Sequence, residues 1–227
     1  MRHKRRVNPE THEELEHRIR EQFPALYITL VSVLVGLALA DLVAEARVRM
    51  VLWPLDLDTL RTWGELTANL FSALSAWTVY AHLGISRRRI PTFADSLIAF
   101  SLPLFILILN SYVGVSPMWK WLYLASGFLV FSLATTLWNF RILREETELA
   151  SFHHLSRITG YPIVFITGIP FYAAAGWADQ HGYLSPLMET IVAWIPAPSA
   201  LFTSFMFLRE WRAAIDATHH DNTKNRP

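Results

Sequence analysis

The stretch Trp194-Ile195-Pro196-Ala197-Pro198-Ser199 interrupts the last apolar segment of the chain, which runs from about residue 187 to 208. A segment of this length can cross a lipid bilayer once, which places the interruption near the middle of the crossing. Proline has no N–H, so the two prolines remove the helical partners of the Val192 and Trp194 carbonyls. Both carbonyls then need other partners.

The residue before each proline is restricted as well. Ile195 and Ala197 are expected to adopt extended backbone geometry. Irregular backbone at membrane depth is tolerated only where protein or a water-filled cavity surrounds it, and Ser199 is close enough to serve as one hydroxyl partner. We therefore expect the rest of the chain to form a bundle around this stretch.

The composition agrees with a membrane protein. Of 227 residues, 52% are hydrophobic, and the charged residues are concentrated in particular segments. The chain has no cysteine, which excludes disulfides, thiolate nucleophiles and cysteine-bound metal. No basic face with interleaved aromatic residues indicates a nucleic-acid partner.

The hydrophobic pattern predicts an all-α, polytopic membrane protein with six transmembrane helices. The charged lead at 1–24 is expected to be an amphipathic helix on the membrane surface or, alternatively, a solvated cytoplasmic segment. A membrane domain is expected to span 25–211, and the tail at 212–227 is expected to be flexible. The six crossings are predicted at about 25–44, 65–83, 94–113, 118–138, 161–178 and 187–208.

Lysine and arginine are distributed unequally between the two sides of this topology. Sixteen of the 20 lie in the two terminal segments and the second and fourth loops, and four lie on the other side. The positive-inside rule then places both termini in the cytoplasm and the chain in the cytoplasmic membrane.

Prolines also interrupt two other predicted crossings. Pro103 and Asn110 share one face of the third, and Gly168 and Pro170 lie near the centre of the fifth. Three interrupted crossings favour a polar interior and a ligand cavity, and ordinary packing kinks are the alternative. The predicted path is formed by Pro103, Asn110, Gly168, Pro170, Pro196, Pro198 and Ser199.

Three acidic residues lie close to the predicted membrane. Asp41 and Glu189 are near the outer ends of the first and sixth crossings, and Asp95 begins the third on the cytoplasmic side. Ionisable groups in a membrane are functional candidates, although ordinary hydration at the interface is the alternative for all three.

Small residues in the first crossing predict a helix-packing surface. Ser32, Gly36, Ala40 and Ala44 recur at every fourth position, which lets another helix approach closely.

Histidines do not form a metal-site pattern. His82, the pair at 153–154 and the pair at 219–220 show no helical His-x-x-x-His spacing within a crossing, so we expect neither a metal nor a cofactor. Haem held between His82 and the 153–154 pair is a weaker alternative. No hydrolase motif supports catalysis.

The region from His82 through Arg87-Arg88-Arg89 and Asp95 to the apolar 97–109 resembles the six-helix potassium channels of lysosomes and bacteria that lack a P-loop. The resemblance covers roughly the first three crossings. The Phe-Ser-Asp signature of that family is replaced here by Ala25-Leu26-Tyr27, so potassium selectivity is not carried over.

The sequence thus favours an ion channel or small-solute transporter, with the bilayer as its surroundings and a monovalent cation or small solute as its ligand. Whether it forms a homo-oligomer is left open. The alternative is a non-catalytic scaffold, assembly or signalling protein acting through a basic cytoplasmic face. A membrane enzyme or haem protein ranks below both.

Overall fold

The computed structural model describes residues 12–49, 55–86, 93–146, 160–206, 208, 209 and 212, and these contain helices and no strand. The helices are α1 (His12–Arg49), α2 (Leu57–Ser86), α3 (Phe93–Ser111), α4 (Trp119–Glu146), α6 (Gly160–Gln180) and α7 (Pro186–Trp194). The chain is helical again at 196–206. All six predicted apolar segments are therefore confirmed as helices.

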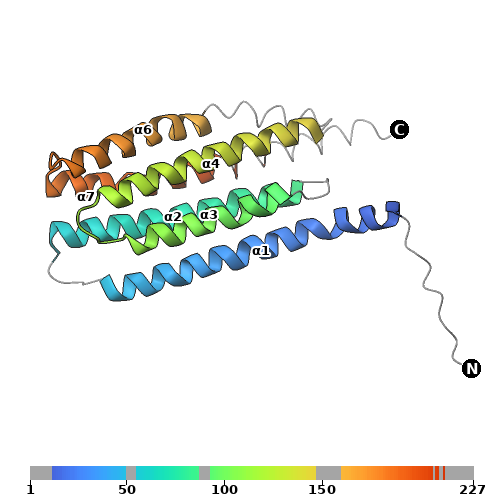
Figure 1. Cartoon of the computed structure of the whole chain (residues 1–227), viewed down its shortest axis with the longest axis horizontal. Coiled ribbons are helices and arrows are strands. Elements are labelled where there is room, and N and C mark those ends of the chain that lie inside the picture. Colours follow the sequence, from blue (N-terminus) through green and yellow to red (C-terminus); the bar gives the residue numbers. More distant parts are fainter. Residues whose placement is uncertain are drawn as a thin grey trace, which may run out of the picture.

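The helices lie along one long axis and alternate in direction (Figure 1). α1 packs against α2 and α3, and α3 packs in turn against α4. The last two helices have different partners, because α6 packs on α4 whereas α7 packs on α2.

Local sequence explains where several helices start and turn. The Thr59 N–H donates to Asp56 Oδ1 at 2.8 Å in the first turn of α2, and this hydrogen bond lowers the pKa of Asp56. Ser185 caps α7, and Pro186 occupies its first turn. Gly114 turns the chain between α3 and α4 with a φ of 64°, a conformation that favours glycine.

The predicted boundary at residues 24 and 25 does not interrupt the structure. α1 continues through Pro24 from His12 to Arg49, so the end of the charged lead and the first apolar segment form one helix. The remainder of the lead, residues 1–11, and the tail after residue 212 lie outside the described residues.

The buried face of α1 differs from the predicted small-residue surface. Its core residues are Tyr27, Val31, Val35, Ala38 and Leu42. Ser32 accepts a hydrogen bond from Trp77 Nε1 at 3.0 Å, but Gly36, Ala40 and Ala44 are exposed. No described atom lies within 4 Å of the position that a Cβ on Gly36 would take. Packing within the chain therefore uses the larger apolar residues, which bury more surface.

Two of the three predicted interruptions are wrong. α3 continues through Pro103 and α6 continues through Pro170, so each proline removes one hydrogen bond without ending its helix. The helix does break at Ile195, as predicted, but Ile195 keeps helical geometry with φ −61° and ψ −38°, and Ala197 is helical. The expected extended geometry at these two residues is therefore wrong.

Two described helical segments are long and apolar enough to cross a membrane, Glu21–Arg49 and Trp119–Trp138. A shorter apolar helix spans Phe100–Ser111. In the described part of the chain, the other predicted crossings do not meet this measure of length and hydropathy.

Gly64 allows the closest approach between α2 and α7. A Cβ at this position would lie 2.9 Å from Trp194 Cδ1 and 3.0 Å from Ala193 Cβ. It would also lie 3.1 Å from the backbone carbonyl carbon of Ala193, which cannot rotate away. Contacts this short force a neighbouring group to move.

We predict that Gly64→Ala lowers the free energy of unfolding by about 1–3 kcal/mol, because the added methyl group overpacks the contact between α2 and α7. Gly36→Ala is the matched control, since its methyl group enters open space on a helix, and it should raise stability by up to about 1 kcal/mol. Denaturant unfolding followed by circular dichroism measures both. Equal effects of the two variants would contradict the close contact.

Candidate functional site

A cavity of about 360 Å³ lies among α2, α3, α4, α6 and the chain from Ile195 to Thr203. Ser72, Ser75, Ala76, Val79 and Tyr80 form its α2 wall. The volume falls within the range of small-molecule binding pockets. The cavity is therefore the candidate ligand site of this fold.

The helices place both large and small side chains on the cavity wall. Phe128 and Leu129 of α4 face Phe165 and Tyr172 of α6 across it. Gly168 brings α6 close to α4, because a Cβ there would lie 3.0 Å from Leu129 Cδ1. None of the described residues that line the cavity carries a charge.

Hydroxyl groups supply the polar part of the lining. Several already bond to nearby backbone: the Ser199 hydroxyl donates to the Ile195 carbonyl at 3.0 Å, and the Thr203 hydroxyl donates to the Ser199 carbonyl at 2.8 Å. The hydroxyls of Ser132 and Thr136, one turn apart on α4, make no hydrogen bond to another described residue. Thr136 is only 9% exposed, and the buried hydroxyl of Tyr172, which also lines the cavity, has no described hydrogen-bond partner.

The helix break at Ile195 borders the cavity, because Ile195 and Pro196 both line it. The Ile195 N–H donates to the Val192 carbonyl at 3.4 Å, which replaces the bond that Pro196 cannot make. The Ser199 hydroxyl donates to the Ile195 carbonyl. The sequence had led us to expect it to bond to the Val192 or the Trp194 carbonyl. The broken backbone is thus largely satisfied locally.

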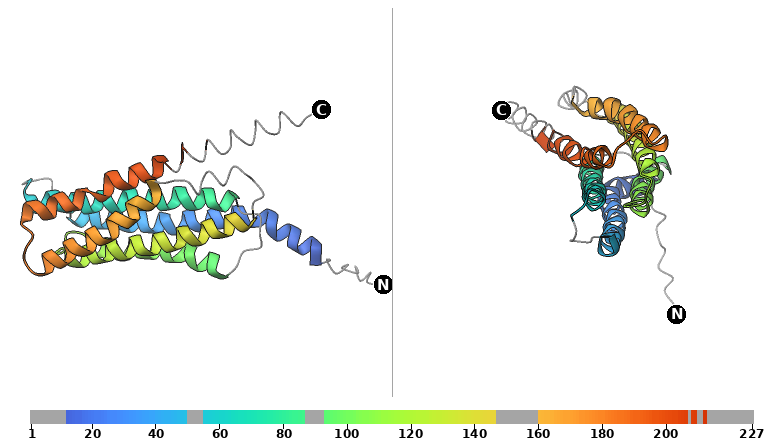
Figure 2. Two further views of the ribbon diagram at one scale, coloured as in Figure 1. Left: turned by 90° about the horizontal axis from the view of Figure 1, so that it is seen from above. Right: turned by 90° about the vertical axis from the view of Figure 1, so that its left-hand side faces the viewer.

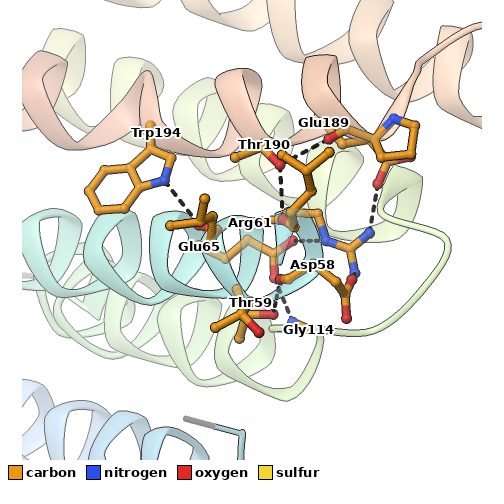
Figure 3. A network of polar contacts seen from close by, with 12 residues as sticks. Asp58, Thr59, Arg61, Glu65, Gly114, Glu189, Thr190 and Trp194 are labelled. Atoms are coloured by element: carbon orange, nitrogen blue, oxygen red, sulfur yellow. Dashed lines mark hydrogen bonds and ion pairs between the residues drawn. The ribbon is translucent and has the colours of Figure 1, made fainter. Parts of the chain in front are cut away.

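A cluster of charged residues, the Arg61 cluster, lies at the start of α2 and α7 (Figure 3). The buried Arg61 guanidinium donates from Nη1 to Glu189 Oε2 at 2.6 Å and pairs through Nη2 with Asp58 Oδ1 at 2.6 Å. Its Nε is 3.6 Å from Glu65 Oε1. One guanidinium therefore joins carboxylates from two helices that are far apart in sequence.

Further hydrogen bonds tie this cluster to neighbouring backbone. The fully buried Glu65 accepts from the Gly114 N–H in the turn between α3 and α4. On α7, Thr190 donates to the Leu57 carbonyl and Trp194 Nε1 donates to the Leu60 carbonyl, each at 3.0 Å (Figure 3). α7 is thereby fixed to α2 at several points, from Glu189 to its last residue, Trp194.

A second polar cluster joins α1, α2 and α3. Asn110 is fully buried, and its Oδ1 accepts from Asn69 Nδ2 at 3.0 Å. Its Nδ2 donates to the Ala38 carbonyl and to Asp41 Oδ2, each at 3.0 Å. These bonds connect three helices, so Asn110 acts as an interhelical contact.

The structure brings together only part of the predicted path. Gly168, Pro196 and Ser199 line the cavity. The other four described path residues lie elsewhere: Pro103 is buried beside the lining residue Leu102, Asn110 belongs to the second polar cluster, and Pro170 and Pro198 are exposed.

The predicted acidic candidates have specific partners where the structure describes them. Asp41 bonds to Asn110, and Glu189 bonds to Arg61. The side chains of Asp95 and His82, and both histidine pairs, lie outside the described set. Among the described residues no group of three His, Asp or Glu side chains is placed to hold a metal.

Some site residues were not identified from sequence. Asp58, Arg61 and Glu65 follow i, i+3 and i+7 spacing, which places them on one helix face and signals an ion-pair cluster. Ser132 and Thr136 have i, i+4 spacing, but hydroxyls in apolar helices are common and gave no distinct signal.

Comparison of the chain with known protein families, curated proteins and solved structures finds no match. The resemblance of residues 82–109 to the six-helix potassium channels gains no support from these comparisons.

We predict that Arg61→Met destabilises the fold by about 3–5 kcal/mol, because it leaves the buried Glu65 and the partly buried Glu189 without a counter-charge. Adding Glu65→Gln should recover part of this loss. Lys120→Met, at an exposed position, should change stability by less than about 1 kcal/mol. Thermal unfolding of the four proteins measures the effect, and an Arg61→Met variant as stable as the control would rule out a structural role for the cluster.

Proposed function

We propose that this chain is a six-span protein of the cytoplasmic membrane, with both termini in the cytoplasm, whose cavity is the binding site of a carrier for a small uncharged solute. The observation that carries the proposal is an uncharged cavity of about 360 Å³ inside a helical bundle whose outer surface is apolar.

The outer surface supports membrane insertion. Exposed apolar side chains recur along the helices, where a water-soluble bundle would place polar residues. Examples are Leu26, Val33 and Leu37 of α1, Leu97, Phe100 and Leu104 of α3, Ile166 of α6, and Leu201, Phe202 and Phe205 after the break.

Aromatic residues at one end of the bundle support the same arrangement. Trp119 and Tyr123 at the start of α4 lie with ring centroids 5.9 Å apart. Trp177 and Tyr183, at the end of α6 and in the following turn, lie 5.7 Å apart. Tryptophan and tyrosine are enriched where a membrane meets water, so this end fits the predicted outer interface.

The lining favours a neutral solute over the monovalent cation considered from sequence. Paths for ions through membranes usually contain charged side chains or rings of free carbonyls. The described cavity wall has no charge, and the charges of Arg61 and Glu189 are paired with each other. An apolar wall with a few hydroxyls suits a mostly apolar molecule with one hydrogen-bonding group.

The break at Ile195 supports movement during transport. α7 is held to α2 by the Arg61 cluster, whereas the helical segment 196–206 is separated from α7 by the break. Ser75 connects this segment to α2, since its hydroxyl donates to the Ala200 carbonyl at 3.2 Å and accepts from the Ser204 hydroxyl at 2.7 Å. Movement of segment 196–206 at the cavity wall would break these two hydrogen bonds.

One observation favours the alternative of an assembly protein. Gly36, Ala40 and Ala44 form an exposed row of small residues, which in a membrane suits close contact with a helix of another chain. A stoichiometric partner without solute binding would support this alternative.

We predict opposite sidedness for two introduced cysteines, Gln180→Cys at the end of α6 and Arg212→Cys after the last helix, both at exposed positions. The chain has no native cysteine to interfere. In intact cells, a membrane-impermeant maleimide should label Gln180→Cys, and Arg212→Cys should react only after permeabilisation. Labelling of both in intact cells, or of neither, would contradict the topology.

We predict that the purified protein binds benzyl alcohol, an uncharged and mostly apolar probe, and does not bind benzoate, its charged counterpart, because no described lining residue compensates a charge. Saturation-transfer NMR measures both. Ala200→Phe fills the cavity and should abolish the benzyl alcohol signal, whereas Ala174→Phe on the exposed face of α6 should retain it. Equal binding of benzoate, or binding that persists in Ala200→Phe, would overturn the proposed site.

A further inference from the structure

The cavity reaches the outer surface of the bundle beside α6 and the helix break. Phe171 of α6 and Ile195 at the helix break both line the cavity, yet they are 40% and 36% exposed. Their exposure locates a mouth between α6 and the last helical segment.

The packing of the helices explains why this mouth stays open. α6 packs on α4, and α7 packs on α2, while α6 makes no comparable contact with α7 within the described helices. The end-on view in Figure 2 shows α6 and the last helical segment as separate ribbons on the same side of the bundle. Phe165 of α6 and Thr203 of the last helical segment line the cavity from its two sides and are themselves buried, so the opening lies at the more exposed Phe171 and Ile195.

The depth of the mouth indicates what surrounds it. Phe171 lies nine residues from Gln180, the outer end of α6, and Ile195 lies nine residues from Pro186, the outer end of α7. At 1.5 Å per residue, both are about 14 Å from that end. In a hydrocarbon core about 30 Å thick, the mouth would open near the middle of the bilayer.

We infer that the solute is a lipid-soluble, single-chain molecule with one uncharged hydrogen-bonding group, and that it enters the cavity sideways from the bilayer through the mouth between Phe171 and Ile195. This inference rests on the proposed membrane-embedded carrier. Ile166 on α6 and Phe202 after the break, on the two segments that border the mouth, are exposed apolar residues that suit contact with acyl chains. A water-soluble solute would have to cross hydrocarbon to reach this mouth.

The hydroxyls of Ser132 and Thr136 supply the hydrogen-bonding end of the site. Both line the cavity, and neither bonds to another described residue. Thr136 lies toward the cytoplasmic end of α4, about 12 Å along the helix from Phe128 by residue count. An extended chain can therefore lie along the cavity with its polar group at these hydroxyls.

The test uses a diazirine-bearing octanol in phosphatidylcholine vesicles that contain the full-length protein, with adducts located by mass spectrometry after illumination. We expect adducts on the cavity stretch 128–136 and on the exposed face of α3 at Leu104. In the double variant Phe171→Cys/Ile195→Cys, a bismaleimide that bridges the mouth should reduce cavity adducts at least about fivefold and leave Leu104 adducts unchanged. The single-cysteine variants treated in the same way are controls for bulk at the mouth.

A second measurement tests the polar end without closing the mouth. Ser132→Ala/Thr136→Val should weaken octanol labelling of the cavity about five- to tenfold, the loss expected for one hydrogen bond. Thr67→Val, whose hydroxyl bonds to the Trp63 carbonyl away from the cavity, is the matched control and should label normally.

The outcomes separate this inference from the function on which it rests. Labelling that continues in the bridged protein would overturn the lateral route while the carrier proposal stands. Adducts at Leu104 without cavity adducts would overturn a lipid-soluble solute, and absence of adducts at both places would overturn membrane insertion itself.

Discussion

The buried guanidinium of Arg61 is the constraint on which the arrangement of the last helices depends. A buried charge is stable only with opposite charges and hydrogen bonds around it, and Glu65 and Glu189 provide them from two helices. Gly64, one turn away, lets α7 approach α2 closely enough for these bonds to form. The position of α7 therefore follows from one ion-pair cluster and one missing side chain.

The cavity is a consequence of this placement. α6 packs on α4 and not on α2, and Gly168 and Gly176 let it lie close to α4. The turn after Gln180 connects α6 to α7, but α6 packs on α4 whereas α7 packs on α2. The cavity lies between these two helix pairs and is lined by residues of both. The charges of the Arg61 cluster pair with one another away from the cavity, and no described residue of the cavity wall is charged.

Particular residues show why sequence identified part of this site and missed the rest. The double proline correctly located a break at the cavity wall, because loss of backbone hydrogen bonds is a local property. Pro103 and Pro170 carry the same local signal, yet their helices continue through them, because one missing hydrogen bond does not by itself end a helix. Asn110 was predicted to lie on the ligand path, but it does not line the cavity; it bonds instead to Asn69 and Asp41 of other helices, partners that only the fold reveals.

The sequence by itself determined that the chain is helical, where its six apolar helices lie and where the last of them breaks, because these properties depend on residues within a few turns of one another. Only the tertiary structure decided which face of α1 is buried, that Arg61 pairs with a carboxylate 128 residues later, and that α6 and the last helical segment enclose a neutral cavity with an open side. Such contacts depend on how whole helices are positioned relative to one another, and a pattern along the chain does not specify which helices pack together.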